Sequence, residues 1–218
     1  MGRITALTAQ RGRRDRLNVF LDEEFAFGIG QEEAVRAGLR IGSELTPADV
    51  ERLRERDEAT GYVNDALRFL SFRPRSLSEI ERYLHGRGAD EAKVTEALDR
   101  LQRTGLVDDE AFARYWVENR DAFSPRGSRA LQAELRAKGV DREHIAEALA
   151  EAEDEVSEDE RAYQAALKRA RSLSRADEES FRRRLYGFLQ RRGFDYETTR
   201  KTTDRLWQEG TEGTEGTE

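Results

Sequence analysis

Arginine side chains are the residues of this chain best suited to bind a ligand. Lysine occurs only as Lys93, Lys138, Lys168 and Lys201, so arginine carries almost all of the positive charge. The planar guanidinium group donates paired hydrogen bonds that match phosphate and carboxylate groups. Five arginines lie in the segment 177–192, which we expect to form a helix.

Apolar residues in this segment recur at spacings of three and four, which predicts the buried face of the helix: Phe181, Leu185, Phe188 and Leu189. At about 100° per residue, the remaining positions place arginines on the opposite side and on one flank. A glycine lies between them, although glycine costs about 1 kcal/mol in a helix interior. A glycine among exposed arginines would let the backbone of a partner approach closely.

We therefore expect a contact face for DNA phosphates or protein carboxylates on this helix. Its members are Arg183, Arg184, Gly187 and Arg191, with Arg182 beside them. Arg73 and Arg75 form a second, weaker candidate. The alternative is an ordinary solvated basic face with a tolerated glycine.

No pattern in the chain indicates catalysis. It lacks the phosphate loop G-x-x-x-x-G-K-S/T, the dinucleotide motif G-x-G-x-x-G and the metalloprotease motif H-E-x-x-H, and it contains no cysteine. His85 and His144 have no ligand pattern around them, and acidic pairs such as Asp108 and Asp109 begin helices, where they suit the helix dipole. We expect no catalytic residue, no metal and no cofactor.

Composition favours thin helical layers over one thick core. Of the 218 residues, 38% are charged and 37% are hydrophobic, and the formal net charge is −7. The charge is segmented: residues 108–160 hold seven basic and sixteen acidic side chains, a net −9, and residues 161–205 hold thirteen and six, a net +7. No apolar run approaches the roughly 20 residues of a membrane span, and no signal peptide is recognisable. We expect a cytoplasmic monomer.

The N-terminal segment, 1–59, is expected to contain a small sheet. Residues 17–21 and 25–29 alternate with a period of two around the polar turn 22–24, which predicts a β-hairpin, and Ile4–Leu7 is a candidate third strand. Thr46 followed by Pro47 predicts a helix start, and we expect that helix to end near Thr60.

The rest of the chain repeats itself. Gly88, Gly139 and Gly193 are 51 and 54 residues apart, and each is followed by one apolar residue and then by aspartate. Such a glycine ends a helix at positive φ, and the aspartate caps the next helix. Apolar residues stand four and eight positions before each glycine: Leu84, Leu135 and Leu189, then Ile80, Leu131 and Leu185.

A preceding helix completes each unit, at about 62–72, at 109–123 and after the capping box 157–160. We therefore predict a mainly α protein with three tandem three-helix, helix-turn-helix-like repeats in an elongated curved array, preceded by the N-terminal segment. The expected repeats are 60–107, 108–156 and 157–208, and 209–218 is expected to be a flexible tail.

Four stretches, in this order and spacing, resemble the RecX family of regulatory proteins. Residues 105–113, GLVDDEAFA, resemble the family signature G-L-L/I/V-D-D-x-x-F/Y-A. Residues 134–140, ELRAKGV, are similar to its E-L-x-x-K-G-I/V, and 188–194, FLQRRGF, are similar to its third-repeat region. Residues 19–27 resemble its short hairpin, so the resemblance covers about 1–208.

The resemblance implies a non-enzymatic regulator of recombination, DNA repair and the SOS response. Such proteins bind the RecA recombinase filament on DNA and lower its ATP hydrolysis and strand exchange. Stacked repeats offer an extended surface for such a partner. The implied partners are the RecA filament and single- or double-stranded DNA, bound weakly or through the filament.

Two alternatives stay open from the residues alone. One is a stand-alone nucleic-acid-binding protein, such as a helix-turn-helix transcription factor, whose affinity would depend strongly on salt and on DNA sequence. The other is a scaffold protein that does not contact DNA. Binding to filaments, bare DNA and bare RecA would discriminate between them.

Overall fold

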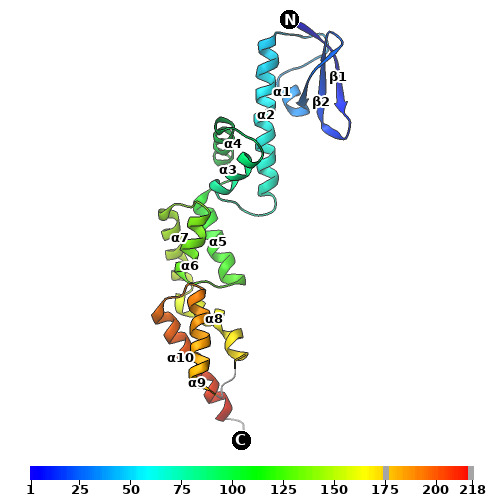
Figure 1. Cartoon of the computed structure of the whole chain (residues 1–218). Helices are drawn as coiled ribbons and strands as arrows, with labels where there is room; N and C mark the ends of the chain where they lie inside the picture. Colours follow the sequence, from blue (N-terminus) through cyan, green and yellow to red (C-terminus); the bar gives the residue numbers. More distant parts are fainter. Residues whose placement is uncertain (174–176, 216–218) are drawn as a thin grey trace. The chain divides into compact units, whose positions relative to one another are not determined.

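The computed structural model describes residues 1–173 and 177–215 (Figure 1). The chain forms two compact units. The first comprises Met1–Phe72 with Glu81–Thr104, and the second comprises Arg73–Ile80 with Gly105–Glu218. The first unit holds a small sheet and helices, and the second is helical.

The sheet has four antiparallel strands in the order β3-β2-β1-β4. The strands are β1 (Gly2–Gln10), β2 (Arg13–Leu21), β3 (Glu24–Gly30) and β4 (Glu44–Leu45). The predicted hairpin and third strand are confirmed, whereas β4 and the short helix α1 (Gln31–Arg36) were not predicted. Asp22 and Glu23 make the hairpin turn with φ of 49° and 72°, as a two-residue turn that follows the strand twist requires.

Helix α2 runs without a break from Pro47 to Leu70. The predicted start is confirmed, since the Thr46 side chain accepts a hydrogen bond from the Asp49 backbone N–H at 3.1 Å. The prediction that one helix ends near Thr60 and another begins near 62 is wrong. Buried positions at helical spacing, Leu53, Asp57, Val63 and Ala66, continue across the expected boundary, so packing outweighs the cost of an interior glycine.

Eight helices follow α2 in the described residues, and together with the end of α2 they build the repeats. The end of α2 packs with α3 and α4, α5 packs with α6 and α7, and α8 packs with α9 and α10. Tandem three-helix domains are therefore confirmed, while the limits assigned to each repeat stay a prediction. The bounds are α3 Leu77–Gly86, α4 Glu91–Arg103, α5 Asp109–Phe123, α6 Ser128–Ala137, α7 Arg142–Glu155, α8 Glu158–Arg171, α9 Glu178–Arg191 and α10 Tyr196–Glu215.

The repeat anchors occupy equivalent places. Gly88, Gly139 and Gly193 have φ of 92°, 82° and 87°, as predicted for helix ends. All six predicted apolar anchors are fully buried. Asp90 and Asp195 accept the capping hydrogen bonds expected of them, and the equivalent aspartate before α7 makes no such bond.

The last helix departs from the sequence expectation in two ways. Thr199 and Thr203 replace the apolar residues of the other repeats and are equally buried. The Thr203 hydroxyl donates to the Thr199 carbonyl at 2.7 Å, whereas the buried Thr199 hydroxyl has no partner among the described residues. Residues 210–215, expected to belong to a flexible tail, continue α10, and 216–218 lie outside the described residues. Extending an existing helix adds one hydrogen bond for each residue fixed, which favours this continuation.

An acid from the next repeat caps the middle helix of the preceding one. Asp109 accepts a hydrogen bond at 2.8 Å from the Leu77 backbone N–H at the start of α3. Glu158 accepts at 3.0 Å from the backbone N–H and at 2.8 Å from the hydroxyl of Ser128, at the start of α6. These carboxylates satisfy donors that a helix start leaves unpaired. The acidic pair 108–109 is therefore structural: its first member caps its own helix and its second caps the neighbour.

The first junction, where residues 73–80 meet the end of α6, carries a half-buried ionic cluster. Glu79 accepts from both terminal nitrogens of Arg73, at 3.0 and 2.8 Å, and from Lys138 Nζ at 2.9 Å. The Ser76 hydroxyl donates to the Lys138 carbonyl at 2.6 Å. Burial raises the pKa of Glu79, but the hydrogen bonds and charges of its two cationic partners prevail and hold that pKa at about 2.

We expect Glu79→Gln to destabilise the protein at neutral pH by about 1.5–3 kcal/mol, the range for hydrogen bonds to charged groups. The folded-state pKa lies below the ordinary 4.5, so the contribution of Glu79 is present above pH 4.5 and is lost as the pH falls toward 2. Urea unfolding should therefore show a stability difference from the parent that shrinks between pH 7 and pH 3.

The exposed Glu147 supplies the matched control, because Glu147→Gln removes the same charge from α7. It should change stability by less than about 0.5 kcal/mol at either pH. A Glu79→Gln deficit of equal size at pH 7 and pH 3 would contradict the ionic role of this cluster.

Candidate contact surfaces

Helix α9 positions the arginines singled out in the sequence. Asp177 caps its start, accepting a hydrogen bond from the Glu179 backbone N–H at 3.1 Å. Phe181, Leu185 and Leu189 are buried as predicted. Phe188, which was predicted to belong to the same buried face, is only half-buried. The buried face of α9 is therefore narrower by one residue than predicted.

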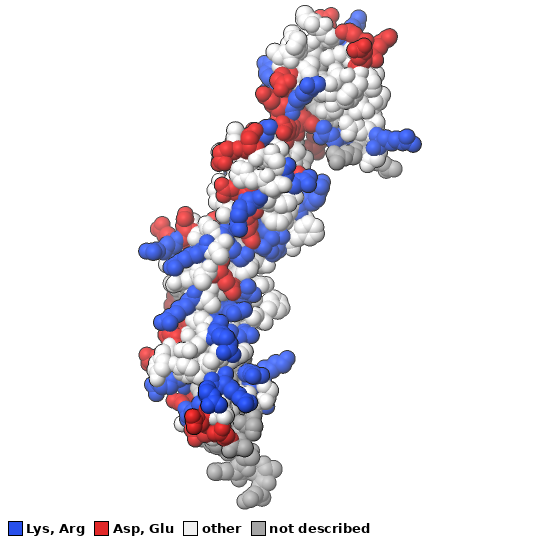
Figure 2. Space-filling model, viewed as in Figure 1, with Lys and Arg blue, Asp and Glu red and all other residues white. Residues whose placement is uncertain are grey.

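The opposite side of α9 exposes Arg183, Arg184 and Arg191. Among the residues that the structure describes, none of the three lies within ion-pair distance of a carboxylate. Arg183 donates a long hydrogen bond to the Ser180 hydroxyl at 3.4 Å. On the face drawn in Figure 2, Lys and Arg side chains gather over the second unit. Hydrogen bonds from Ser180 lower the pKa of Asp177, and Arg183 is close enough for its charge to lower that pKa further. The charge of Arg184 and Arg191 is available to a partner.

Gly187 is less open than the sequence suggested. A Cβ built at this position would lie 3.2 Å from Arg191 Nη1 and within 4 Å of no other atom outside its own stretch of helix. The guanidinium of Arg191 therefore lies over the glycine. A partner backbone would have to displace Arg191 to reach it.

Arg182 is not free to bind a partner. Its guanidinium donates to Glu178 on the same helix at 2.7 Å and also pairs with Asp204 of α10. It joins α9 to α10 and thus has a role within the third repeat.

The second candidate pair, Arg73 and Arg75, is less exposed than the three exposed arginines of α9. Arg73 is held by Glu79 in the ionic cluster described above and donates to the Pro74 carbonyl at 2.7 Å. Arg75 is half-buried, and burial together with the charge of Arg73 lowers its pKa. The structure thus does not bring these two arginines together with the α9 face.

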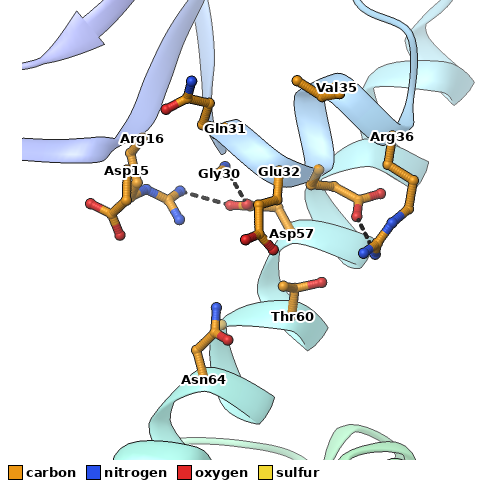
Figure 3. A pocket seen from close by; sticks show the side chains of 12 residues that line it. Asp15, Arg16, Gly30, Gln31, Glu32, Val35, Arg36, Asp57, Thr60 and Asn64 are labelled. Atoms are coloured by element: carbon orange, nitrogen blue, oxygen red, sulfur yellow. Dashed lines mark hydrogen bonds and ion pairs between the residues drawn. The ribbon is translucent and has the colours of Figure 1, made fainter.

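A cavity of about 720 Å³ lies in the first unit between β2, α1 and α2 (Figure 3). Two buried acids, Asp57 and Glu33, line it. Asp57 accepts from the Gly30 backbone N–H at 2.6 Å and from Arg16 at 2.7 Å. Glu33 is paired with Arg36 at 3.2 Å. Asp57 and Glu33 are therefore paired within the protein, and none of the described residues that line the cavity indicates catalysis. The hydrogen bonds of Asp57 connect α2 to β2 and to the end of β3.

A smaller hollow of about 330 Å³ lies between α8 and α9, and the sequence reasoning missed it. It has apolar and cationic walls: Ala165, Lys168, Arg169, Ser172, Phe188 and Arg192. A comparison of equivalent positions in the repeats could have found it, because the preceding repeat has tryptophan where this one has Ala165. We refer to it below as the α8–α9 hollow.

The described part of the chain shows neither a metal centre nor a membrane span. Residues 1–173 and 177–215 contain no group of three or more side chains that could hold a metal ion. Within the same ranges, no helix is both long and apolar enough to cross a bilayer.

Tandem three-helix domains behind a small antiparallel sheet define a class of helical repeat proteins. Four family models match the chain: the N-terminal domain of regulatory protein RecX at 2–46, and the first, second and third RecX three-helix domains at 63–101, 108–149 and 157–202. The chain is 32% identical over 214 residues to regulatory protein RecX of Bacillus subtilis, covering 97% of this chain and 80% of that protein. The chain belongs to the RecX family.

Other relatives agree with this assignment. Regulatory protein RecX of Listeria monocytogenes is 29% identical over 195 residues, covering 89% of this chain and 72% of the relative. A crystal structure of regulatory protein RecX superposes with a TM-score of 0.72 at 26% identity, covering 94% of this chain and 100% of that one. The structure of RecX from Lactobacillus salivarius, at 24% identity and a TM-score of 0.61, supports the fold.

Proposed function

We propose that this chain binds the RecA recombinase filament on DNA and lowers its ATP hydrolysis and strand exchange. It acts as a cytoplasmic monomer without catalytic activity of its own. Membership of the RecX family along almost the whole chain is the observation that carries this proposal. The contact face is Arg183, Arg184 and Arg191, because these exposed arginines have no carboxylate partner among the described residues.

The first test is binding to RecA–single-stranded-DNA–nucleotide filaments, compared with bare DNA and bare RecA. Selective binding to filaments, together with a slower ATP hydrolysis rate, is the expected result. Equal binding to bare DNA would favour a stand-alone nucleic-acid-binding protein, and binding to none of the three would favour a scaffold. An unchanged hydrolysis rate at several-fold excess over filament sites would refute the proposal.

The triple variant Arg183→Glu, Arg184→Glu, Arg191→Glu should lose at least about tenfold in inhibitory potency toward RecA ATP hydrolysis. Loss of only about 1.4 kcal/mol of binding free energy suffices for that factor. The assay is run at about 150 mM salt, where the Debye length is about 8 Å, so that direct contacts dominate over long-range charge effects.

The control is a second triple variant that makes the same change in net charge at exposed arginines outside α9: Arg56→Glu, Arg100→Glu, Arg142→Glu. Both variants are first checked for parental helicity and melting temperature. If the α9 triple variant inhibits as well as the parent, or if both variants lose potency equally, α9 is not the contact face.

A further inference from the structure

Among the residues that line the α8–α9 hollow, three are cations and none is an acid. Lys168 and Arg169 come from the last turn of α8, and Arg192 follows the end of α9. Ala165 and Phe188 give it an apolar floor. Arg192 lies over the Phe188 ring, with its guanidinium carbon 4.7 Å from the ring centre.

The preceding repeat shows what normally fills this space. The capping residues of α5 and α8, Asp108 and Ser157, are 49 positions apart, so Trp116 corresponds to Ala165. The Trp116 ring lies against two cations, with Lys138 Nζ at 4.0 Å and the Arg120 guanidinium at 4.7 Å from the ring centre. Replacement of this indole by a methyl group leaves the equivalent space in the third repeat empty.

The preceding repeat also neutralises its cations. Glu134 accepts from Trp116 Nε1 and from Arg120 Nε, both at 2.8 Å, and Glu79 accepts from Lys138. At the spacing of 54 residues that relates the anchor glycines after α6 and α9, the counterpart of Glu134 is Phe188. At the spacing of 51 residues, the counterpart of Glu79 is Ala130. The cations of the third repeat thus lack the counterparts of both carboxylates, one from their own repeat and one from the repeat before it.

The cations remain although their carboxylates are gone. Arg120 corresponds to Arg169 and Lys138 corresponds to Arg192. Arg192 Nη1 donates to uncharged acceptors, the Pro125 carbonyl at 3.1 Å and the Ser124 hydroxyl at 3.4 Å. Burial lowers the pKa of Arg192, and the charge of the nearby Arg126 lowers it further. An anionic ligand would replace the missing charge.

We propose that the α8–α9 hollow binds a nucleotide of single-stranded DNA. The base packs against Phe188 and the guanidinium plane of Arg192, and the flanking phosphates contact Lys168 and Arg169. Stacking surfaces beside backbone-binding cations are the usual design of sites for single-stranded nucleic acid. Phe123, which precedes Ser124 and is 82% exposed, offers the next base a second stacking surface. An acidic peptide would satisfy the cations but leave these aromatic surfaces uncovered.

Binding of single-stranded DNA by the hollow can be tested by fluorescence anisotropy of a labelled oligothymidine with the full chain. RecA is left out of the assay, so the result does not depend on the proposed function. A length of about 15 nucleotides covers one binding site of this kind. The Lys168→Ala, Arg169→Ala variant should bind at least about tenfold more weakly. Its log–log salt slope should be about 1.4 units shallower, since each contact to a single-strand phosphate contributes about 0.7.

The matched control is Arg136→Ala, Arg142→Ala, which removes two exposed arginines of the same unit outside the hollow and should change affinity less than twofold. A second variant, Ala165→Trp, restores the filling residue of the preceding repeat. It should weaken binding by a similar factor while the salt slope stays parental, because all three cations remain. Parental helicity and melting temperature are required of each variant.

The proposal is overturned if the parent does not bind the oligonucleotide, or if the Lys168, Arg169 variant binds it like the parent. Polyglutamate is the competitor that represents an acidic protein segment. Displacement of the oligonucleotide by polyglutamate at equal charge concentration would assign the hollow to such a segment and overturn the proposal as well. Failure of polyglutamate to compete is the expected result.

Discussion

We expect Leu135→Ala to lower the free energy of unfolding by about 2–5 kcal/mol, the range for truncating a buried leucine. Leu135 has no exposed surface and lies in the core of the second repeat with Phe112, Leu131, Val140 and Ile145. The substitution removes apolar contacts and leaves a cavity that packed helices fill only partly. Urea unfolding followed by helical circular dichroism measures the loss.

Leu106→Ala is the control for this experiment, since Leu106 belongs to the same unit but is 54% exposed. Its effect should stay below about 0.5 kcal/mol, as for most surface substitutions. A loss below about 1 kcal/mol for Leu135→Ala would count against the equivalence of the repeat anchors.

Alanine at Gly139 or at Gly193 should cost about 2–5 kcal/mol, and alanine at Gly88 only about 1–2 kcal/mol. All three glycines have positive φ, where a Cβ costs roughly 1–2 kcal/mol. At Gly139 the added Cβ would also overlap the Ser78 side chain, and at Gly193 it would overlap Ala130, which adds about 1–3 kcal/mol. At Gly88 it meets no atom within 4 Å.

The Gly88→Ala variant is therefore the internal control, because it isolates the conformational cost from the cost of overlap. Urea unfolding of the three single variants gives the comparison. Equal losses at all three positions would show that close approach at the two junctions contributes nothing to stability.

The spacing of glycine, aspartate and apolar residues along the chain was sufficient to predict the three-helix repeats. A glycine that ends a helix and an aspartate that caps the next act on their own backbone, and apolar spacing of three and four belongs to a single helix. The positive φ of Gly88, Gly139 and Gly193 and the burial of their anchor leucines could therefore be read from the sequence. The exposed arginines of α9 followed from the same spacing.

Contacts between elements could not be predicted in this way. The sequence explained Gly139 and Gly193 by conformation alone, whereas the structure adds a close approach to the preceding repeat. Arg182 has the same residue type and nearly the same position as Arg183, yet it is paired with Asp204 of α10, 22 residues away. Which arginine stays exposed without an acidic partner depends on the neighbouring helix.

The sequence by itself determined the family, the three-helix repeats and the side of α9 that faces solvent, because these follow from spacing along one chain segment. Only the tertiary structure decided which charges are compensated. Glu79 neutralises Lys138 from 59 residues away, and the equivalent Arg192 meets carbonyl and hydroxyl oxygens instead. Ion pairing depends on distances of a few ångströms between separate helices, and those distances are set when the repeats pack.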